Sequence, residues 1–172
     1  MLALFLTREG IKLIQQKIGF GYDIHRFKKG RKLILGGVPI PYSKGLEGHS
    51  DADVLLHAIC DALLGAIGQG DIGEHFPNTD RRYKGISSLV LLSKVNNLVA
   101  KEDFKINNID TVVIAEKPNL KSYKTKMRST IAKTLSISSH LVNIKATTQE
   151  GLDFGKKGIA AYAIALVTRK GK

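Results

Sequence analysis

The sequence predicts one domain of the α+β class, an α/β sandwich in which a single sheet is covered by helices on one face. With 172 residues, of which 43% are hydrophobic, the chain is long enough for one compact domain and short for two. It has no internal repeat, no low-complexity tract and no linker rich in Pro, Gly and Ser. Segments with the period of a strand alternate with segments with the period of a helix, and such alternation indicates a sheet layered with helices.

The first predicted strand starts at Ile18. From residue 18 to residue 25, apolar or aromatic side chains at even positions alternate with Gly, Asp and His at odd positions, and a period of two is typical of a strand. Residues 33–35 and 38–40 flank two glycines and predict a β-hairpin, in which Pro39 favours an edge position. Residues 1–17 precede these elements, and we expect them to be a frayed or loosely docked extension.

The next predicted element is an amphipathic helix. Ser50 is its predicted N-cap, and Asp53, three residues later, is an acidic near-match to a capping box. An apolar face follows, and we expect the helix to end between Gly65 and Gly70. Later segments predict helices at 86–99 and 120–135 and strands at 109–115, 141–147 and 159–168. This order of elements does not fix the order of the strands in the sheet.

The charges are distributed unevenly. Lys and Arg outnumber Asp and Glu by 27 to 15, and the formal net charge of +12 suggests either an anionic partner or a lysine-rich solvated surface. Residues 47–80, however, contain seven acids, three histidines and no Lys or Arg. Such a segment indicates a cation site. A nucleic-acid-binding module would also explain the net charge, but aromatic residues are few and no nucleic-acid-binding motif is present, so we expect no nucleic-acid partner.

Other sequence features bear on the location of the protein. No apolar run approaches the ~18 residues that cross a bilayer, so we expect no membrane insertion. Residues 2–6 are apolar, but they are too few for a secretory signal and follow no basic segment. Cys60 is the single cysteine, which excludes an intrachain disulfide. We therefore expect a cytoplasmic protein, with a clipped organellar targeting sequence as the alternative.

Asp23, His25 and His57 are the predicted metal ligands. Asp23 and His25 lie two residues apart on a strand and point to the same side, while His57 projects from the helix. Two imidazoles and a carboxylate leave a fourth tetrahedral position open, as a catalytic zinc requires. The alternative is a surface strand beside a satisfied histidine. Asp53 or Asp61, one helical turn from His57, could orient its ring or could be solvated acids.

A phosphate site is predicted next to these ligands. Gly48, His49 and Ser50 directly precede the predicted helix, where free backbone N–H groups favour an anion. Ser50 could equally act as a cap alone. His75 and His140 have no partner that the sequence identifies.

Four ordered blocks of the sequence share a pattern with one enzyme family. The blocks are GFGYDIH at 19–25, GLEGHSDADV at 45–54 with His57, GDIG at 70–73 with FPNTD at 76–80, and KATTQE at 145–150 with Phe154. Together they resemble the 2-C-methyl-D-erythritol 2,4-cyclodiphosphate synthases. The resemblance covers residues 18–168, which we expect to form the family domain between an extension at 1–17 and a tail at 169–172.

The resemblance implies an assembly and a set of cofactors. It implies a mixed sheet with βαβ units and a homotrimer with active sites between neighbouring subunits. It further implies Zn²⁺ bound by Asp23, His25 and His57. A second divalent ion, Mg²⁺ or Mn²⁺, would be held by the substrate's diphosphate, with Glu150 as its protein ligand.

The resemblance also implies the substrate contacts. His49 and Ser50 would hold phosphate oxygens, and His49 and Thr148 would stabilise the transition state. The cytidine site would comprise Ala115, Glu116, Lys117, Pro118, Asn119, Leu120, Lys121, Thr147 and Thr148. The methylerythritol site would comprise Asp71, Ile72, Gly73, Phe76, Pro77, Asn78, Thr79 and Asp80. The remaining predicted substrate contacts are Asp23, His25, Gln149, Glu150, Phe154 and Lys157.

Four residues depart from the usual family pattern. Tyr22 replaces a common Phe, Asn78 a common Asp, Asn119 a common Lys and Lys157 a common Arg. None of them is a predicted metal ligand. Lys157 keeps a cation but lacks a planar guanidinium, which puts bidentate phosphate binding there in doubt.

The implied activity is that of a phosphorus–oxygen lyase in the non-mevalonate isoprenoid pathway. It converts 4-diphosphocytidyl-2-C-methyl-D-erythritol 2-phosphate to the cyclic 2,4-diphosphate and releases CMP. The sequence has no nucleophile elbow and no P-loop. The implied reaction needs neither, because the substrate's own phosphate is the nucleophile. A zinc-dependent phosphohydrolase would use the same three ligands and stays an alternative.

Overall fold

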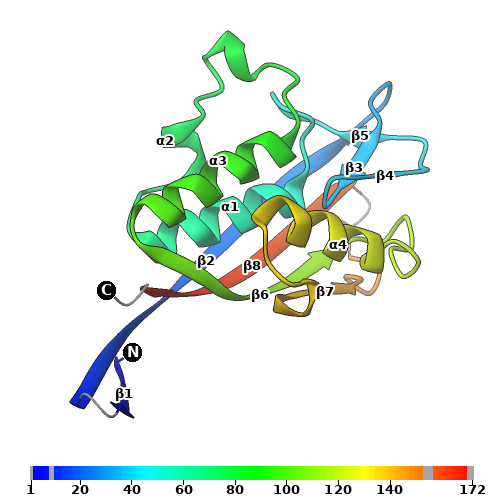
Figure 1. Ribbon diagram of the computed structural model, residues 1–172. Coiled ribbons are helices and arrows are strands. Elements are labelled where there is room, and N and C mark those ends of the chain that lie inside the picture. Colours follow the sequence, from blue (N-terminus) through cyan, green and yellow to red (C-terminus); the bar gives the residue numbers. More distant parts are fainter. Residues whose placement is uncertain (1, 8–9, 153–156, 170–172) are drawn as a thin grey trace.

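One mixed sheet forms the base of the molecule. The computed structural model describes residues 2–7, 10–152 and 157–169 (Figure 1). The sheet has the strand order β1-β2-β8-β6-β7, and β5 pairs with β2 outside this path. Its strands are β1 (Leu2–Thr7), β2 (Gly10–Lys28), β5 (Gly45–Leu46), β6 (Phe104–Ile114), β7 (Val142–Thr147) and β8 (Gly158–Arg169).

The pairing of the strands confirms the predicted mixed sheet. β8 lies antiparallel to both β2 and β6, whereas β6 and β7 are parallel. α4 (Lys124–Leu135) connects β6 to β7, so this part of the chain is a βαβ unit. The predicted hairpin is also present, as the separate two-stranded sheet of β3 (Leu33–Leu35) and β4 (Val38–Ile40).

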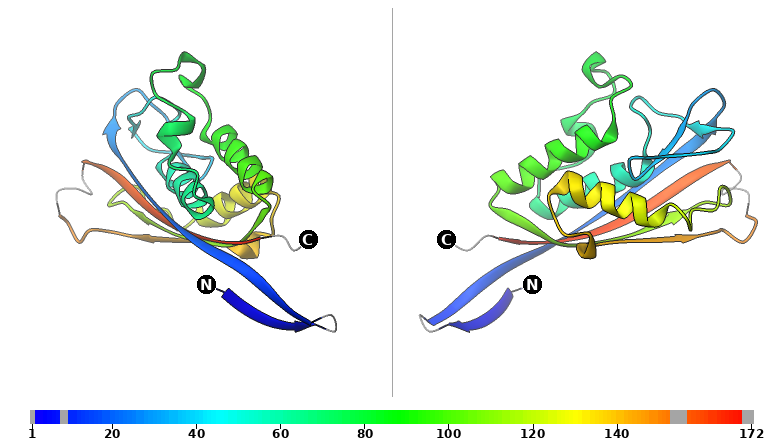
Figure 2. Two further views of the ribbon diagram at one scale, coloured as in Figure 1. Left: turned by 90° about the vertical axis from the view of Figure 1, so that its left-hand side faces the viewer. Right: turned by 45° about the vertical axis from the view of Figure 1, so that its right-hand side comes forward.

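The helices cover one face of the sheet, as the sequence predicts. α1 (Val54–Ile67), α3 (Ser88–Lys101) and α4 all lie on the same side in the two views of Figure 2. The core fills the space between the helices and the sheet, and it includes fully buried Leu55, Ile59 and Leu63 of α1. Burial of these side chains stabilises the layered arrangement, at roughly 1.5–3 kcal/mol each.

Two glycines bring α1 into direct contact with β2. A Cβ atom on Gly19 would lie 1.8 Å from the carbonyl oxygen of Ala62, and one on Gly21 would lie 2.0 Å from that of Ala58. Real side chains never approach a backbone oxygen so closely, so only glycine fits at these two positions. The helix therefore lies almost on the backbone of the strand.

The apolar side of β2 faces away from the helices. Because Gly19 and Gly21 face α1, their alternating neighbours point to the opposite side of the sheet. Ile18 is 66% exposed, Phe20 61%, and Tyr22 and Ile24 are each 41% exposed. On β8, Ile164 is 48% exposed on the neighbouring strand, where it pairs with Phe20. The chain thus presents an uncovered apolar sheet face, the row 18, 20, 22, 24 and 164.

The cap of α1 differs from the predicted one. α1 begins at Val54, and its N-cap is Asp53, whose side chain accepts a hydrogen bond from the backbone N–H of Leu56. Asp53 also accepts hydrogen bonds from the N–H groups of Gly36 and Gly37, so it ties the β3–β4 turn to the helix. Ser50 lies before the helix and does not cap it.

Complete burial raises the pKa of the Asp53 carboxyl from 3.8 to about 6, although the three N–H donors act to lower it. Between these two pH values the folded protein binds more of this proton than the unfolded chain does, so the contribution of Asp53 to stability decreases as the pH rises through that window.

The N-terminal part of β2 is longer than the sequence predicts. The strand begins at Gly10 rather than at Ile18, and it pairs with β1 to form a hairpin that extends beyond the other strands (Figure 2). Gln16 and Lys17 already pair with Thr168 and Val167 of β8. Residues 10–17 contain no alternation of apolar and polar side chains, which is why the sequence pattern did not indicate a strand there.

Several short elements were not predicted. They are β1, β5, the short helix α2 (Ile72–His75) and the 3₁₀ turns η1 (Arg81–Tyr83) and η2 (Ser139–Leu141). In the part of the chain that the structure describes, no helix combines the length and the apolar character needed to cross a membrane.

The glycine contact generates the first prediction. Gly21→Ala should lower the free energy of unfolding by about 3 kcal/mol or more, because the new methyl group can be accommodated only by moving the backbone of α1. Urea denaturation followed by circular dichroism measures this.

Gly65→Ala is the matched control on the helix side of the same interface. A Cβ atom there would lie 3.9 Å from its nearest neighbour, the carbonyl oxygen of Phe20, so this change should raise stability by roughly 0.5–1 kcal/mol. A Gly21→Ala protein as stable as the wild type would contradict the close-contact account.

Candidate metal centre and substrate pockets

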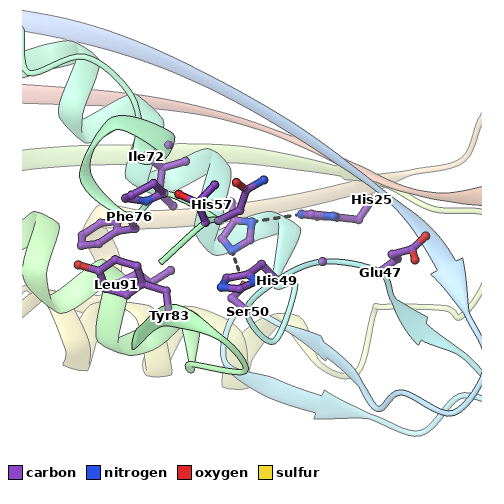
Figure 3. Close-up of a pocket in the computed structure, with 14 residues that line it drawn as sticks. His25, Glu47, His49, Ser50, His57, Ile72, Phe76, Tyr83 and Leu91 are labelled. Atoms are coloured by element: carbon purple, nitrogen blue, oxygen red, sulfur yellow. Dashed lines mark hydrogen bonds between the residues drawn. The ribbon is translucent and has the colours of Figure 1, made fainter. Parts of the chain in front are cut away.

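Asp23, His25 and His57 converge as predicted. Asp23 and His25 project from the helix-facing side of β2, and His57 projects from the first turn of α1. Oδ2 of Asp23 lies 2.9 Å from Nε2 of His25 and 2.9 Å from Nδ1 of His57. The two imidazole nitrogens are 3.2 Å apart, and Figure 3 shows the rings of His25 and His57 pointing at each other.

Electrostatic interactions among the three side chains stabilise this arrangement. Burial acts to raise the pKa of Asp23, but its hydrogen bonds to His25 and His57 and their charges hold that pKa well below its usual range. Burial acts to lower the pKa of His25, but the hydrogen bond and charge of Asp23 raise it overall. A hydrogen bond from His25 to the backbone of Glu47 raises it further. Asp23 is therefore a carboxylate at neutral pH, the form that can bind a cation.

The three side chains fit a tetrahedral metal ion. Their ligand atoms all lie within 4.8 Å of one another, the single such group of three in the described part of the chain. Three donors at 2.0–2.1 Å from a tetrahedral ion are separated by about 3.3 Å, close to the distances between these three atoms. Two imidazoles and one carboxylate suit a transition metal better than Ca²⁺ or Mg²⁺.

The acids on α1 do not orient His57. Asp53 is the helix cap, and Asp61 accepts a hydrogen bond from the backbone N–H of Ile72. Instead, Nε2 of His57 lies 3.1 Å from the hydroxyl of Ser50 and 3.0 Å from that of Ser88. Ser88 comes from the start of α3, too far along the sequence for helical spacing to have indicated it.

The loop at residues 48–50 is held from behind. Arg31 donates hydrogen bonds to the carbonyl oxygens of Gly48 and Ser50, at 2.7 and 2.5 Å. His49 lies with Nε2 3.2 Å from the carbonyl oxygen of Asp80, and Ser50 accepts a hydrogen bond from the N–H of Ala52. Because α1 starts at Val54 and is capped by Asp53, residues 48–50 lie ahead of the helix N-terminus and not directly at it.

A cavity of about 500 Å³ opens beside the metal ligands (Figure 3). It is lined by eleven of the residues that the sequence predicted for the metal, phosphate and methylerythritol sites, namely His25, Gly48, His49, Ser50, His57, Ile72, Gly73, Phe76, Pro77, Asn78 and Thr79. The sequence assigned no site role to Glu47, Tyr83 and Leu91, which also line it. We refer to this cavity as the metal-side pocket.

Two predicted residues take structural positions at the edge of the metal-side pocket. Asp71 caps α2 by accepting a hydrogen bond from the N–H of Glu74, and Asp80 caps η1 and forms an ion pair with Arg82. Within the pocket wall, the ring of Phe76 packs edge-on against that of Tyr83, with centroids 5.4 Å apart. The ammonium group of Lys94 lies over both rings.

A second cavity of about 570 Å³ lies elsewhere on the chain. It is lined by all nine residues predicted for the cytidine site, together with Lys124 and Ala146. Glu116 supports it by accepting a hydrogen bond from the N–H of Gln149. Within the described part of the chain, this second cavity, the loop-side pocket, shares no lining residue with the metal-side pocket.

The remaining predicted residues follow the loop-side pocket in sequence. The hydroxyl of Thr148 donates a hydrogen bond to Oε1 of Glu150 at 2.7 Å. Oε1 of Gln149 is buried and has no hydrogen-bond partner among the residues that the structure describes. Lys157 is exposed, and Phe154 lies outside the described residues. Glu150 and Thr148 are thus associated with the loop-side pocket and not with the three metal ligands of the same chain.

Comparison with known proteins finds a match over nearly the whole chain. The model of the YgbB family matches residues 16–168. The 2-C-methyl-D-erythritol 2,4-cyclodiphosphate synthase of Clostridium botulinum (strain Eklund 17B / Type B) is 56% identical over 156 residues, which cover 90% of this chain and 99% of that protein. That of Alkaliphilus oremlandii is 55% identical over 155 residues, 89% of this chain and 99% of that protein.

Solved structures share the fold. The bifunctional IspDF of Campylobacter jejuni is 40% identical, with a TM-score of 0.87, over 94% of this chain and 46% of that longer chain. A complex of IspF from Plasmodium falciparum with CDP is 34% identical, with a TM-score of 0.80, over 91% of this chain and 97% of that one.

The convergence of the three ligands generates the second prediction. The wild-type chain should retain about one transition-metal ion per chain after dialysis, and His57→Ala should retain little, because one of three ligands is lost. Elemental analysis measures the metal, and circular dichroism checks folding. His140→Ala, at an exposed position on η2, is the control and should retain the metal. Full metal retention by a folded His57→Ala protein would remove His57 from the ligand set.

Proposed function

This chain belongs to the YgbB family, and on that basis we propose that it is a 2-C-methyl-D-erythritol 2,4-cyclodiphosphate synthase of isoprenoid biosynthesis. It would convert 4-diphosphocytidyl-2-C-methyl-D-erythritol 2-phosphate to the cyclic 2,4-diphosphate with release of CMP. One observation carries the proposal beyond the similarity itself. Three metal-ligating side chains meet at the mouth of a pocket formed by the residues that the family pattern assigns to the substrate.

The metal centre would hold Zn²⁺ through Asp23, His25 and His57, as their donor set favours. Glu150 would contribute to a second site for Mg²⁺ or Mn²⁺ together with the substrate's diphosphate. When bound, the two cations neutralise negative charge that the phosphates bring together. The chain's own side chains then have to bind the substrate and orient its two phosphates.

Particular side chains would bind the substrate and orient it. His49 and Ser50 line the metal-side pocket and would donate hydrogen bonds to phosphate oxygens. The mainly apolar wall with Ile72 and Phe76 would receive the methylerythritol part, and the loop-side pocket would receive cytidine. Thr148 and His49 would interact with the charge that develops in the transition state.

The chemical step is an internal displacement. An oxygen of the 2-phosphate forms a bond to the β-phosphorus, the bond from that phosphorus to the bridging oxygen of CMP breaks, and CMP leaves with the electron pair. No water enters the products. The enzyme's contribution is to hold the two reacting groups together, for which effective molarities reach about 10⁵ M or more.

The two pockets support an oligomeric active site. The substrate carries cytidine at one end and methylerythritol at the other, yet the pockets that suit these ends have no described residue in common. We propose a homotrimer in which the loop-side pocket of one subunit meets the metal-side pocket of its neighbour. The uncovered apolar sheet face supports this, because contiguous exposed apolar patches are typical of subunit interfaces.

The third prediction concerns the products. Incubation with 4-diphosphocytidyl-2-C-methyl-D-erythritol 2-phosphate and Mg²⁺ should give CMP and a cyclic diphosphate in equal amounts, without inorganic phosphate, because the nucleophile is internal. Phosphorus NMR distinguishes the species. The rival zinc-dependent phosphohydrolase predicts oxygen from ¹⁸O-labelled water in one of the products, and that result would overturn the proposal.

The fourth prediction concerns assembly. The wild-type protein should be a trimer by light scattering, and Phe20→Glu should shift it to monomers and abolish turnover, because a charge would be buried in the interface. Val90→Glu is the matched control. Val90 is 44% exposed on α3, on the helical side of the molecule, and its change should leave the trimer intact. A wild-type monomer with full activity at the same concentration would contradict the shared site.

A further inference from the structure

A buried relay of two side chains lies behind His57. Ser88, at the start of α3, is completely buried. Its hydroxyl oxygen lies 3.0 Å from Nε2 of His57 and 2.5 Å from Oδ1 of Asp51. The other carboxylate oxygen of Asp51 accepts a hydrogen bond from the backbone N–H of Ser88 at 3.0 Å, so Asp51 fixes Ser88 through two bonds.

The chemistry of the three groups sets the direction of each hydrogen bond. A carboxylate only accepts hydrogen bonds, so the single hydroxyl hydrogen of Ser88 points to Asp51. The Ser88 oxygen can then only accept from His57, so Nε2 of His57 carries a proton. Nδ1 lies 2.9 Å from the Asp23 carboxylate, which also only accepts, and an ion bound between them takes the place of a proton there and meets the Nδ1 lone pair.

His25, the other histidine of the site, uses the backbone of the chain in place of a serine hydroxyl. His25 makes its second hydrogen bond to the backbone of Glu47, which raises its pKa as an accepting carbonyl does. Among the described residues, the ring of His57 has no such carbonyl as a hydrogen-bond partner, but the Ser88 hydroxyl, whose hydrogen is already engaged, serves the same purpose. Metal-bound histidines in general need an acceptor for their second nitrogen.

Ser50 provides a second hydroxyl group beside Nε2 of His57. Its hydroxyl oxygen lies 3.1 Å from Nε2 of His57, and it already accepts a hydrogen bond from the N–H of Ala52. If Ser50 donated to His57, the proton would move to Nδ1 and the metal-facing lone pair would be lost. With Nε2 protonated through Ser88, the Ser50 hydroxyl hydrogen points instead to the Ser88 oxygen, 3.5 Å away, or into the metal-side pocket that Ser50 lines.

We propose that Asp51 and Ser88 are positioning residues that hold the Nε2 proton of His57 and so leave its Nδ1 lone pair to bind an ion. The proposal rests on the metal site proposed above. It concerns residues that touch neither substrate nor metal, and it assigns a role to a serine that comes from a different helix than the ligand it serves.

The test compares three variants of the full-length protein. In Ser88→Ala, His57 loses the acceptor, and in Asp51→Ala the freed Ser88 hydroxyl can donate to Nε2 and reverse the tautomer. Each should weaken Zn²⁺ binding by about 10–100-fold, measured by competition with a chromophoric chelator. Ser87→Ala is the control. Ser87 is exposed and only caps α3, so its loss should lower the melting temperature but leave zinc affinity unchanged.

Nitrogen NMR gives a readout that a merely structural role would not move. In the metal-free Asp23→Ala protein at alkaline pH, which lacks the competing carboxylate, ¹⁵N shifts should identify Nε2 of His57 as protonated and Nδ1 as bare. Adding Asp51→Ala should shift the proton toward Nδ1. If Asp23→Ala carries the proton on Nδ1, or if Ser88→Ala and Asp51→Ala both bind zinc as the wild type does, the relay is refuted. A wild-type protein that binds no zinc would instead refute the metal site, while the NMR result would still test the relay.

Discussion

The close packing of α1 on β2 is the constraint on which the site depends. His57 can reach Asp23 and His25 only because the helix lies on the strand's backbone, and it lies there only because Gly19 and Gly21 carry no side chain. Glycine in the interior of a strand costs stability, since it adds conformational entropy to the unfolded chain and nothing to the core. Here the cost is offset by the buried apolar face of α1, and the gain is a rigid set of three metal-ligating atoms.

The same constraint also places the apolar side of β2 on the outside of the sheet. Because the side that faces the helix carries Gly, Asp and His, the apolar residues of β2 fall on the uncovered side of the sheet. Exposed apolar rows of this kind are typical of subunit interfaces, and the residues proposed to bind the substrate are divided between two separate pockets. The proposed trimer would bury the apolar row and join the two pockets.

The sequence predicted what depends on local pattern. Alternation placed Asp23 and His25 on one side of a strand, helical periodicity located α1, and the two glycines located the β3–β4 hairpin.

Prediction from the sequence failed where the outcome depends on contacts between distant segments. Asp53 rather than Ser50 caps α1, because only Asp53 can also accept from the N–H groups of the β3–β4 turn. Ser88 lies 31 residues from His57 in the sequence, and no spacing rule connects them. The start of β2 was missed because the strand is extended there by pairing with β8 and β1, and the residues at that end show no strand pattern of their own.

The most direct test of this account is a crystal structure with CDP, recorded also at the zinc absorption edge. The account predicts an anomalous peak among Asp23, His25 and His57, and the cytosine ring in the loop-side pocket of a neighbouring subunit. The diphosphate should extend from that pocket toward the ion. A nucleotide bound wholly within one chain, or an ion held by other residues, would contradict the shared active site.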